Sequence, residues 1–228
     1  QRQMCIRDRI NELGILGLES SLDRADERTR HKNAAVRFAE AARRGSAAGE
    51  ANLVMLFLFE GVHRSDQELG VALQRLSLRA QQGDALARYL LGFAHELGRG
   101  VQQDARRALQ LYRACGDDVF ALKGIVRIGL ASGSVVELDR AHAALVAAGD
   151  GGDGEAAYYV GYMHWLGRGA VRDEALARQW FEKAAAAGFA PALELLRGEG
   201  VPPFVPPRRT EIGHPPWASA YPAVTSNA

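Results

Sequence analysis

The sequence predicts an all-α protein: a right-handed superhelix, or solenoid, of stacked antiparallel helix pairs, followed by an irregular proline-rich C-terminal tail. Two segments, beginning at Ala87 and Ala156, carry the same spaced pattern of small, aromatic and acidic residues, 69 positions apart. That distance equals two units of about 35 residues, and a period in the mid-thirties is typical of helix-pair solenoids. Seven of the eight prolines lie within residues 202–228, where extended conformations are therefore favoured.

Composition sets few limits on function. Of 228 residues, 47% are hydrophobic and 24% are charged, which is typical of globular proteins. The formal net charge of +1 argues neither for a nucleic-acid partner nor for an anionic membrane. The longest apolar run, residues 53–59, is far shorter than the ~20 residues that a membrane helix needs. We therefore predict no transmembrane segment.

The first nine residues, QRQMCIRDR, match the translation of a common transposase-type sequencing adapter, and we interpret residues 1–9 as non-native. On that interpretation the native start, with any signal peptide, is missing, and Cys115 is the only native cysteine. One cysteine cannot form an internal disulfide, so the compartment stays open between the cytoplasm and the periplasm or exterior.

The repeat divides the rest of the chain. We expect residues 10–48 to form a degenerate N-terminal repeat or cap, residues 49–201 the repeat array, and residues 202–228 a largely disordered tail. Besides the two clear copies, a fainter copy starts at Ala51, a degenerate copy spans residues 119–152, and a truncated copy starts at Ala190. The main equivalent positions in the clear copies are Gly92 and Gly161, Gly98 and Gly167, Gly100 and Gly169, Asp104 and Asp173, and Tyr112 and Phe181.

The residue types at these positions have structural explanations. A glycine inside a helix costs about 0.8–1.0 kcal/mol relative to alanine, so its recurrence at Gly92 and Gly161 indicates close helix–helix contact. The paired glycines after each first helix mark a turn where positive φ is required. Asp104 and Asp173 precede the second helices as N-caps or first-turn acids, and Trp180 fills the space between helices.

These two copies resemble the Sel-one-like repeat (SLR), a relative of the tetratricopeptide repeat. The resemblance implies an all-α superhelix that acts as a scaffold or adaptor in protein–protein contacts, chiefly in bacteria. His95 and His164 depart from the pattern, which has tyrosine at that position. The positions that match include Ala87, Tyr89, Leu91, Gly92, Glu96, Gly98, Gly100, Val101, Asp104 and Ala108, and Ala156, Tyr158, Gly161, Gly167, Gly169, Asp173, Ala177, Trp180, Lys183 and Gly188.

No catalytic, cofactor-binding or metal-binding residue is predicted. His95 and His164 lie two repeat units apart, on the order of 20 Å, which is too far to share a zinc ion. Cys115 is interpreted as a small packing residue at the end of a helix. The glycine- and aspartate-rich run of residues 149–154 lacks a glutamate at calcium-loop spacing, so we interpret it as a linker between repeats. We therefore predict that the chain is not an enzyme.

The first helix of each copy is predicted to line the concave face of the array. Its positions outside the packing pattern are apolar and aromatic, with a basic interruption by Lys123 and Arg127 in the degenerate copy. Exposed surface of this kind marks binding sites, although some of these side chains could instead pack against the next repeat. The predicted partner-binding residues are Val54, Phe57, Leu58, Leu86, Leu90, Phe93, Arg127, Tyr159, Tyr162 and Met163.

The favoured function is a protein-interaction scaffold, monomeric, that holds a peptide or helix of a partner protein in its groove. One alternative is an accessory fragment of a larger bacterial envelope or enzymatic protein whose N-terminal part is missing. Another is an RNA-binding helical-repeat array, but the near-zero charge and the lack of a base-reading pair in each repeat weigh against nucleic acid.

Two interpretations of the tail remain. It is either a loose extension, or Phe204 and its neighbouring prolines fold back over the C-terminal end of the array. The second is physically reasonable because polyproline II segments favour grooves lined by aromatic residues, and the predicted inner face offers Phe57, Phe93, Tyr159 and Tyr162.

Overall fold

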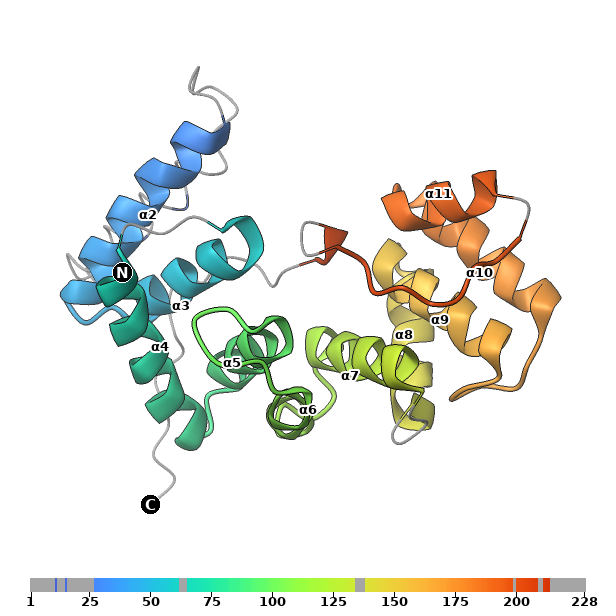
Figure 1. The fold of residues 1–228 in the computed structure, drawn as a ribbon, viewed down its shortest axis with the longest axis horizontal. Helices are drawn as coiled ribbons and strands as arrows, with labels where there is room; N and C mark the ends of the chain where they lie inside the picture. Colours follow the sequence, from blue (N-terminus) through green and yellow to red (C-terminus); the bar gives the residue numbers. More distant parts are fainter. Residues whose placement is uncertain are drawn as a thin grey trace, which may run out of the picture. The chain divides into compact units, whose positions relative to one another are not determined.

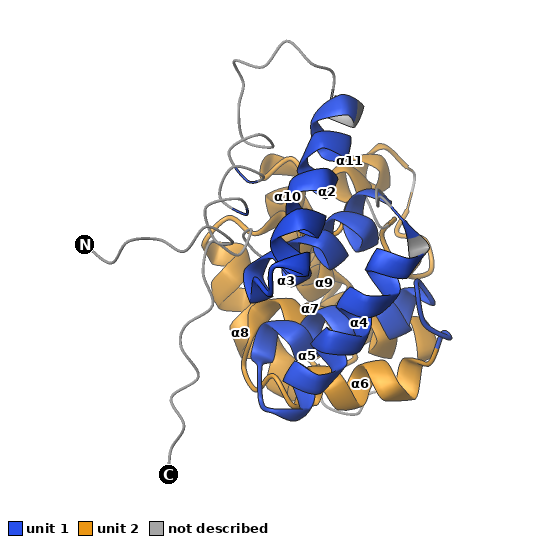
Figure 2. Cartoon of the chain, turned by 90° about the vertical axis from the view of Figure 1, so that its left-hand side faces the viewer, with its two compact units in different colours: residues 1–103, 215–228 blue, residues 104–214 orange. Residues whose placement is uncertain are grey.

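The computed structural model describes residues 11, 15, 27–61, 65–133, 138–198, 200–208 and 211–213. Residues 1–9, which we interpret as adapter sequence, and residues 214–228 of the tail lie outside this part of the chain. The chain divides into two compact units, residues 1–103 with 215–228 and residues 104–214, coloured separately in Figure 2. All regular structure in the described residues is helical, which confirms the predicted all-α class.

Unit 1 consists of helices that pack on their neighbours along the chain (Figure 1). Helix α3 contacts α2, α4 and α5, and α4 contacts α5. The elements of unit 1 are α2 (Glu27–Arg43), α3 (Ala47–Met55), the π-helical turn η1 (Leu56–Glu60), α4 (Asp66–Gln81) and α5 (Ala85–Leu97).

Unit 2 also consists of helices that pack on their neighbours along the chain. Each helix from α6 to α11 packs against the next, and α7 also contacts α9, so first helices of successive repeats lie side by side. Its elements are α6 (Ala105–Arg113), α7 (Val119–Ser132), α8 (Leu138–Asp150), α9 (Gly154–Leu166), α10 (Glu174–Ala186) and α11 (Ala190–Arg197).

Aspartates begin several of these helices. Asp104 accepts a hydrogen bond from the amide of Arg107, and Asp173 accepts one from the amide of Leu176, each at 2.9 Å. Such caps satisfy amides that have no partner inside the helix. At the opposite helix ends, Gly98 and Gly167 stop α5 and α9 with φ of 66° and 63°, a conformation that other residues rarely adopt. The same local code therefore sets equivalent boundaries in both copies.

A short π-helical turn in unit 1 is not predicted by the repeat. Helix α3 passes at Leu56 into η1, which ends at Gly61 with φ of 73°. The fainter copy stands 36 residues before the next, slightly more than half of the 69-residue spacing. Ala51 precedes Gly61 by 10 residues, whereas Ala87 precedes Gly98 by 11, so the additional length of the fainter copy lies after the π turn.

The helix glycines of unit 2 permit close contact with aromatic rings. A Cβ added to Gly161 in α9 would lie 2.5 Å from Cε1 of Phe181 in α10. In the degenerate copy, Gly124 of α7 stands in the same relation to Tyr112 of α6, whose Cε2 lies 2.4 Å from the added Cβ. Real carbon atoms do not approach so closely, so any side chain here would push the helices apart.

We expect Gly161→Ala to lower the free energy of unfolding by about 1–3 kcal/mol, because overpacking outweighs the better helix propensity of alanine. The matched control is Gly70→Ala in α4, where an added Cβ meets nothing within 4 Å and alanine should stabilise the helix. Urea unfolding of both variants measures the difference. Equal stabilisation by both substitutions would contradict the close contact.

Candidate functional site

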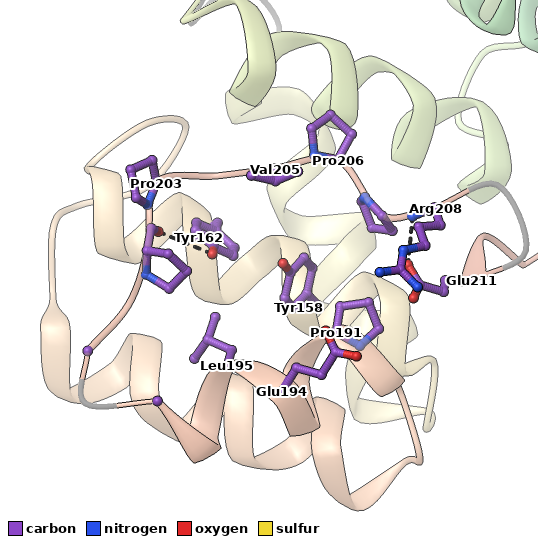
Figure 3. A pocket seen from close by; sticks show the side chains of 14 residues that line it. Tyr158, Tyr162, Pro191, Glu194, Leu195, Pro203, Val205, Pro206, Arg208 and Glu211 are labelled. Carbon is purple, nitrogen blue, oxygen red and sulfur yellow. Dashed lines mark hydrogen bonds between the residues drawn. The ribbon is translucent and has the colours of Figure 1, made fainter.

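The strongest candidate site is one face of α9 together with the chain segment after α11 that lies on it. Glu155, Tyr159 and Tyr162 follow one another at four and three residues along α9, so they share a helix face. Tyr158 lies beside them, and all four side chains are buried. Figure 3 shows Tyr158 and Tyr162 pointing toward the segment that contains Pro203, Val205 and Pro206.

The segment of residues 200–208 crosses this face as extended chain, drawn in red in Figure 1. The ring of Phe204 lies among three tyrosines, with centroid distances of 5.0 Å to Tyr162, 6.2 Å to Tyr159 and 6.4 Å to Tyr158. Edge and tilted arrangements at such distances are favourable aromatic contacts. The structure thus places Phe204 in an aromatic slot on α9.

Two side chains of α9 bind main-chain groups of the residues that follow α11, one in the segment and one at Gly213. The Tyr162 hydroxyl donates to the carbonyl oxygen of Pro202 at 3.3 Å, a dashed line in Figure 3. The amide of Gly213 donates to Oε2 of Glu155 at 3.2 Å. Both bonds involve backbone groups, which nearly every residue has.

A cleft of about 440 Å³ remains beside the segment. Its walls come from α9, from the C-terminal part of unit 2 and from the segment itself (Figure 3). A volume of this size is in the range of ligand sites. The side chains that line it include Tyr158, Tyr162, Pro191, Glu194, Leu195, Val205, Arg208 and Glu211.

A buried charge cluster joins α7 to this face. Nζ of Lys123 lies 2.8 Å from Oε2 of Glu155 and 3.0 Å from Oδ2 of Asp153, and Nη1 of Arg127 lies 3.3 Å from Oε1 of Glu155. Arg127 also donates to the Tyr159 hydroxyl at 3.2 Å, which donates to Glu155 at 2.9 Å. Lys123, Arg127 and Glu155 are each less than 5% exposed. Two cations and two carboxylates balance, so the cluster presents no net charge to a ligand.

The tyrosine hydroxyls of the face stay protonated at neutral pH. Burial raises the pKa of Tyr158, and a side-chain hydrogen bond to Tyr162 adds to the effect. Burial also raises the pKa of Tyr159, with the Glu155 carboxylate next in importance, and raises the pKa of Tyr162. A neutral tyrosine keeps its O–H donor, which Tyr162 uses on a carbonyl oxygen.

A histidine pair lies elsewhere in unit 2. Nε2 of His142 in α8 lies 3.2 Å from Nε2 of His164 in α9, and Nδ1 of His164 lies 2.9 Å from the carbonyl oxygen of Val171. A carbonyl only accepts, so Nδ1 of His164 carries a proton and its Nε2 accepts from His142. Residue spacing along the chain does not reveal this pair, because the two histidines lie on different helices. Among the described residues, no three His, Cys, Asp or Glu side chains could hold a metal ion.

Most of the predicted partner-binding residues are buried under their own chain. In unit 1, Phe93 stacks on Phe59 at 4.7 Å, and Arg99 lies over the Phe57 ring at 4.6 Å and donates to the carbonyl of Leu58. Contact with a partner therefore requires movement of what covers them, and the predicted role stays a prediction. Leu86 is half-buried, whereas Val54, Phe57, Leu58, Leu90, Phe93, Arg127, Tyr159, Tyr162 and Met163 are buried.

The structure adds Glu155, Asp153 and Tyr158 to the site. The repeat pattern indicates Tyr158 only as a packing position, and Glu155 belongs to none of the predicted sites. The spacing of Glu155 with Tyr159, and of Lys123 with Arg127, is four residues in each case. Two such pairs on equivalent helices could have indicated a facing charge cluster.

Comparisons with known proteins agree with this architecture. Residues 85–114 and 154–189 match the Sel1 repeat. A crystal structure of a Sel1 repeat protein from Oxalobacter formigenes is similar with a TM-score of 0.58 and 25% identity, covering 83% of this chain and 76% of that one. No curated protein matches the chain significantly.

A second solved structure resembles the fold. It is a protective antigen present in uropathogenic Escherichia coli strains that displays an SLR fold, with a TM-score of 0.53 and 20% identity over 87% of this chain. The matched part is 43% of that protein's length. Stacked helix pairs with this repeat define an α-solenoid. Two segments of the chain are similar to the Sel1 repeat, and the fold is similar to that of solved Sel1 repeat and SLR-fold proteins.

The His142–His164 pair predicts a pH-dependent stability. Burial lowers the pKa of His142, repulsion from His164 adds to this, and Asp139 opposes it. The unfolded chain then takes up a proton at His142 more readily than the folded chain, so stability is present above pH ~6.5 and declines as pH falls below it. We expect the melting temperature of wild type to fall from pH 8 to pH 5, and to fall less in His142→Gln. Equal falls in the melting temperatures of wild type and His142→Gln from pH 8 to pH 5 would contradict a contribution of His142.

The charge cluster predicts a large cost for Glu155→Gln. The substitution keeps the shape but leaves Lys123 and Arg127 buried without their shared carboxylate, and breaking a buried pair costs about 3–5 kcal/mol. The control is Asp117→Asn, which removes an exposed ion pair with Arg140 and should change stability by a few tenths of a kcal/mol. Denaturant unfolding measures the free energy of unfolding of both variants. A loss for Glu155→Gln as small as that for Asp117→Asn would argue against a tightly coupled cluster.

Proposed function

We propose that this chain is a protein-interaction scaffold whose α9 face binds an extended segment of a partner protein. Sel1 repeat proteins are generally protein-interaction scaffolds, and their fold is typically non-catalytic. None of the described helices is both long enough and apolar enough to cross a membrane. The observation that carries the proposal is the contact of residues 200–208 and 211–213 with α9.

The donor and acceptor groups on this face match those of a peptide backbone. Tyr162 supplies a donor for a carbonyl oxygen, and Glu155 supplies an acceptor for an amide. Between them, Tyr158, Tyr159 and Tyr162 surround an aromatic side chain. Backbone bonds that hold the ligand and a pocket that selects a side chain are the two components of extended-peptide recognition.

The predicted inner-face residues of unit 2 belong to this proposal. Tyr159 and Tyr162 contact the segment directly, and Arg127 supports Tyr159 from α7. Tyrosine and arginine are enriched at protein interfaces, where they combine apolar contact with hydrogen bonding. The balanced charge of the neighbouring cluster favours a ligand that is neutral where it crosses the face.

The proposal is tested by selecting binders for the full chain from a displayed library of random 16-residue peptides. The dissociation constants of selected peptides are then measured by fluorescence anisotropy on wild type and on Tyr162→Phe. Loss of one hydrogen-bond donor should weaken binding about 2–10-fold. Tyr89→Phe in α5 is the matched control, because it removes a hydroxyl outside this face and should leave affinity unchanged.

Two results would count against the proposed function. One is the absence of any peptide that binds with a reproducible dissociation constant. The other is equal affinity for wild type and for Tyr162→Phe across all selected peptides, since binding would then not use the α9 face.

A further inference from the structure

The segment on α9 shows a three-residue pattern of burial. Val201 and Phe204 are half-buried, and Pro207 is buried. The residues between them face solvent, and Val205 is 68% exposed. Those exposed residues are Pro202, Pro203, Val205 and Pro206.

This pattern is what a polyproline II helix produces when it lies on a surface. That helix has three residues per turn, so residues i, i+3 and i+6 share one side. Prolines at 202, 203, 206 and 207 preset the backbone for it and remove the amides that would otherwise need partners. Such a ligand loses little entropy on binding, because its conformation is largely formed beforehand.

We propose that the α9 face is a polyproline-type recognition site with the pattern apolar-x-x-aromatic-x-x-Pro, and that the chain's own residues 201–208, with 211–213, occupy it as an internal competitor. The external ligand is a proline-rich segment of a partner protein that carries the same pattern. This inference rests on the proposed function and specifies its ligand and its regulation.

The internal segment makes the contacts expected of a competitor, and its C-terminal end is also bound to the array. Ile212 is 7% exposed, and the Gly213 amide binds the Glu155 carboxylate. The Arg208 amide donates to Oε2 of Glu211 at 2.6 Å, which folds the chain locally just before this anchor. The segment therefore covers both the aromatic slot and the Lys123–Glu155 ion pair.

Connection to the array gives the segment an advantage over any free ligand. The segment directly follows α11, which ends at Arg197. A short connection of this kind corresponds to an effective concentration of millimolar order. A partner with the same pattern must bind tightly, or be present at high local concentration, to displace it. Weakening the internal segment should thus raise the apparent affinity for an external one.

The test uses a labelled synthetic peptide of residues 201–213, VPPFVPPRRTEIG, and three full-length proteins: wild type, Phe204→Ala and Val205→Ala. Phe204→Ala removes the side chain in the aromatic slot, and Val205→Ala truncates its neighbour that faces solvent. We expect the peptide to bind Phe204→Ala at least tenfold more tightly than wild type, and Val205→Ala like wild type. Hydrogen exchange of residues 201–213 should rise in Phe204→Ala alone.

The peptide sequence tests the three-residue pattern. Alanine in the peptide at the positions of Val201, Phe204 or Pro207 should each weaken binding to the Phe204→Ala protein several-fold. Alanine at the positions of Val205 or Pro206 should change it less than twofold. Equal losses at all five positions would overturn the pattern.

The remaining outcomes separate this inference from the proposed function. Equal binding of the peptide to all three proteins would show that the internal segment does not compete, and would leave peptide binding at the face intact. No binding to any of them would overturn the ligand pattern, while library-selected peptides still decide the function. A concentration-dependent wild-type dimer that Phe204→Ala abolishes would assign the segment to a second copy and overturn the intramolecular form.

Discussion

The site in unit 2 depends on one buried carboxylate. Glu155 accepts from Lys123 and Arg127 of α7, from Tyr159 one turn along α9, and from the Gly213 amide. Burying this charge is costly, so it is stable only when every partner is in place. That requirement fixes the register of α7 against α9, orients Tyr159 in the slot and provides an anchor for the C-terminal segment.

The aromatic slot is in turn a product of repeat packing. Because position 161 is glycine, the Phe181 ring of α10 lies directly on α9. Phe181 supports Tyr158 and Tyr162 at centroid distances of 6.0 Å and 5.1 Å, and Phe189 contacts Tyr158 at 5.2 Å. Packed neighbours hold these rings in place, and a binding site built on rigid elements loses less entropy when a ligand arrives. The repeat core therefore shapes the recognition surface as well as stabilising the helices.

A site occupied by its own chain explains how a tyrosine-rich face stays out of water. Tyr158, Tyr159 and Tyr162 would otherwise expose a contiguous apolar patch, which favours unspecific association. Exchange of the segment that covers this face with Phe204, Pro207 and Ile212 is the step proposed above. Such exchange would link binding of a partner to release of the C-terminal segment. The apparent affinity for the partner is then set by the difference between the binding free energies of the partner and of the internal segment.

The sequence alone determined the helix-pair architecture, because a repeated local code of capping aspartates, turn glycines and small helix residues fixes each copy independently of the rest. It also indicated Tyr159, Tyr162 and Arg127 as residues of one face, and Phe204 with its prolines as a segment able to dock. Only the tertiary structure brought Lys123 to Glu155, His142 to His164 and Gly213 to Glu155, since these pairs join separate elements. Likewise, the burial of Leu90 and Phe93, predicted as groove residues, depends on which neighbours cover a helix. Helix periodicity says which side chains share a face, and long-range packing decides whether that face meets solvent or the chain itself.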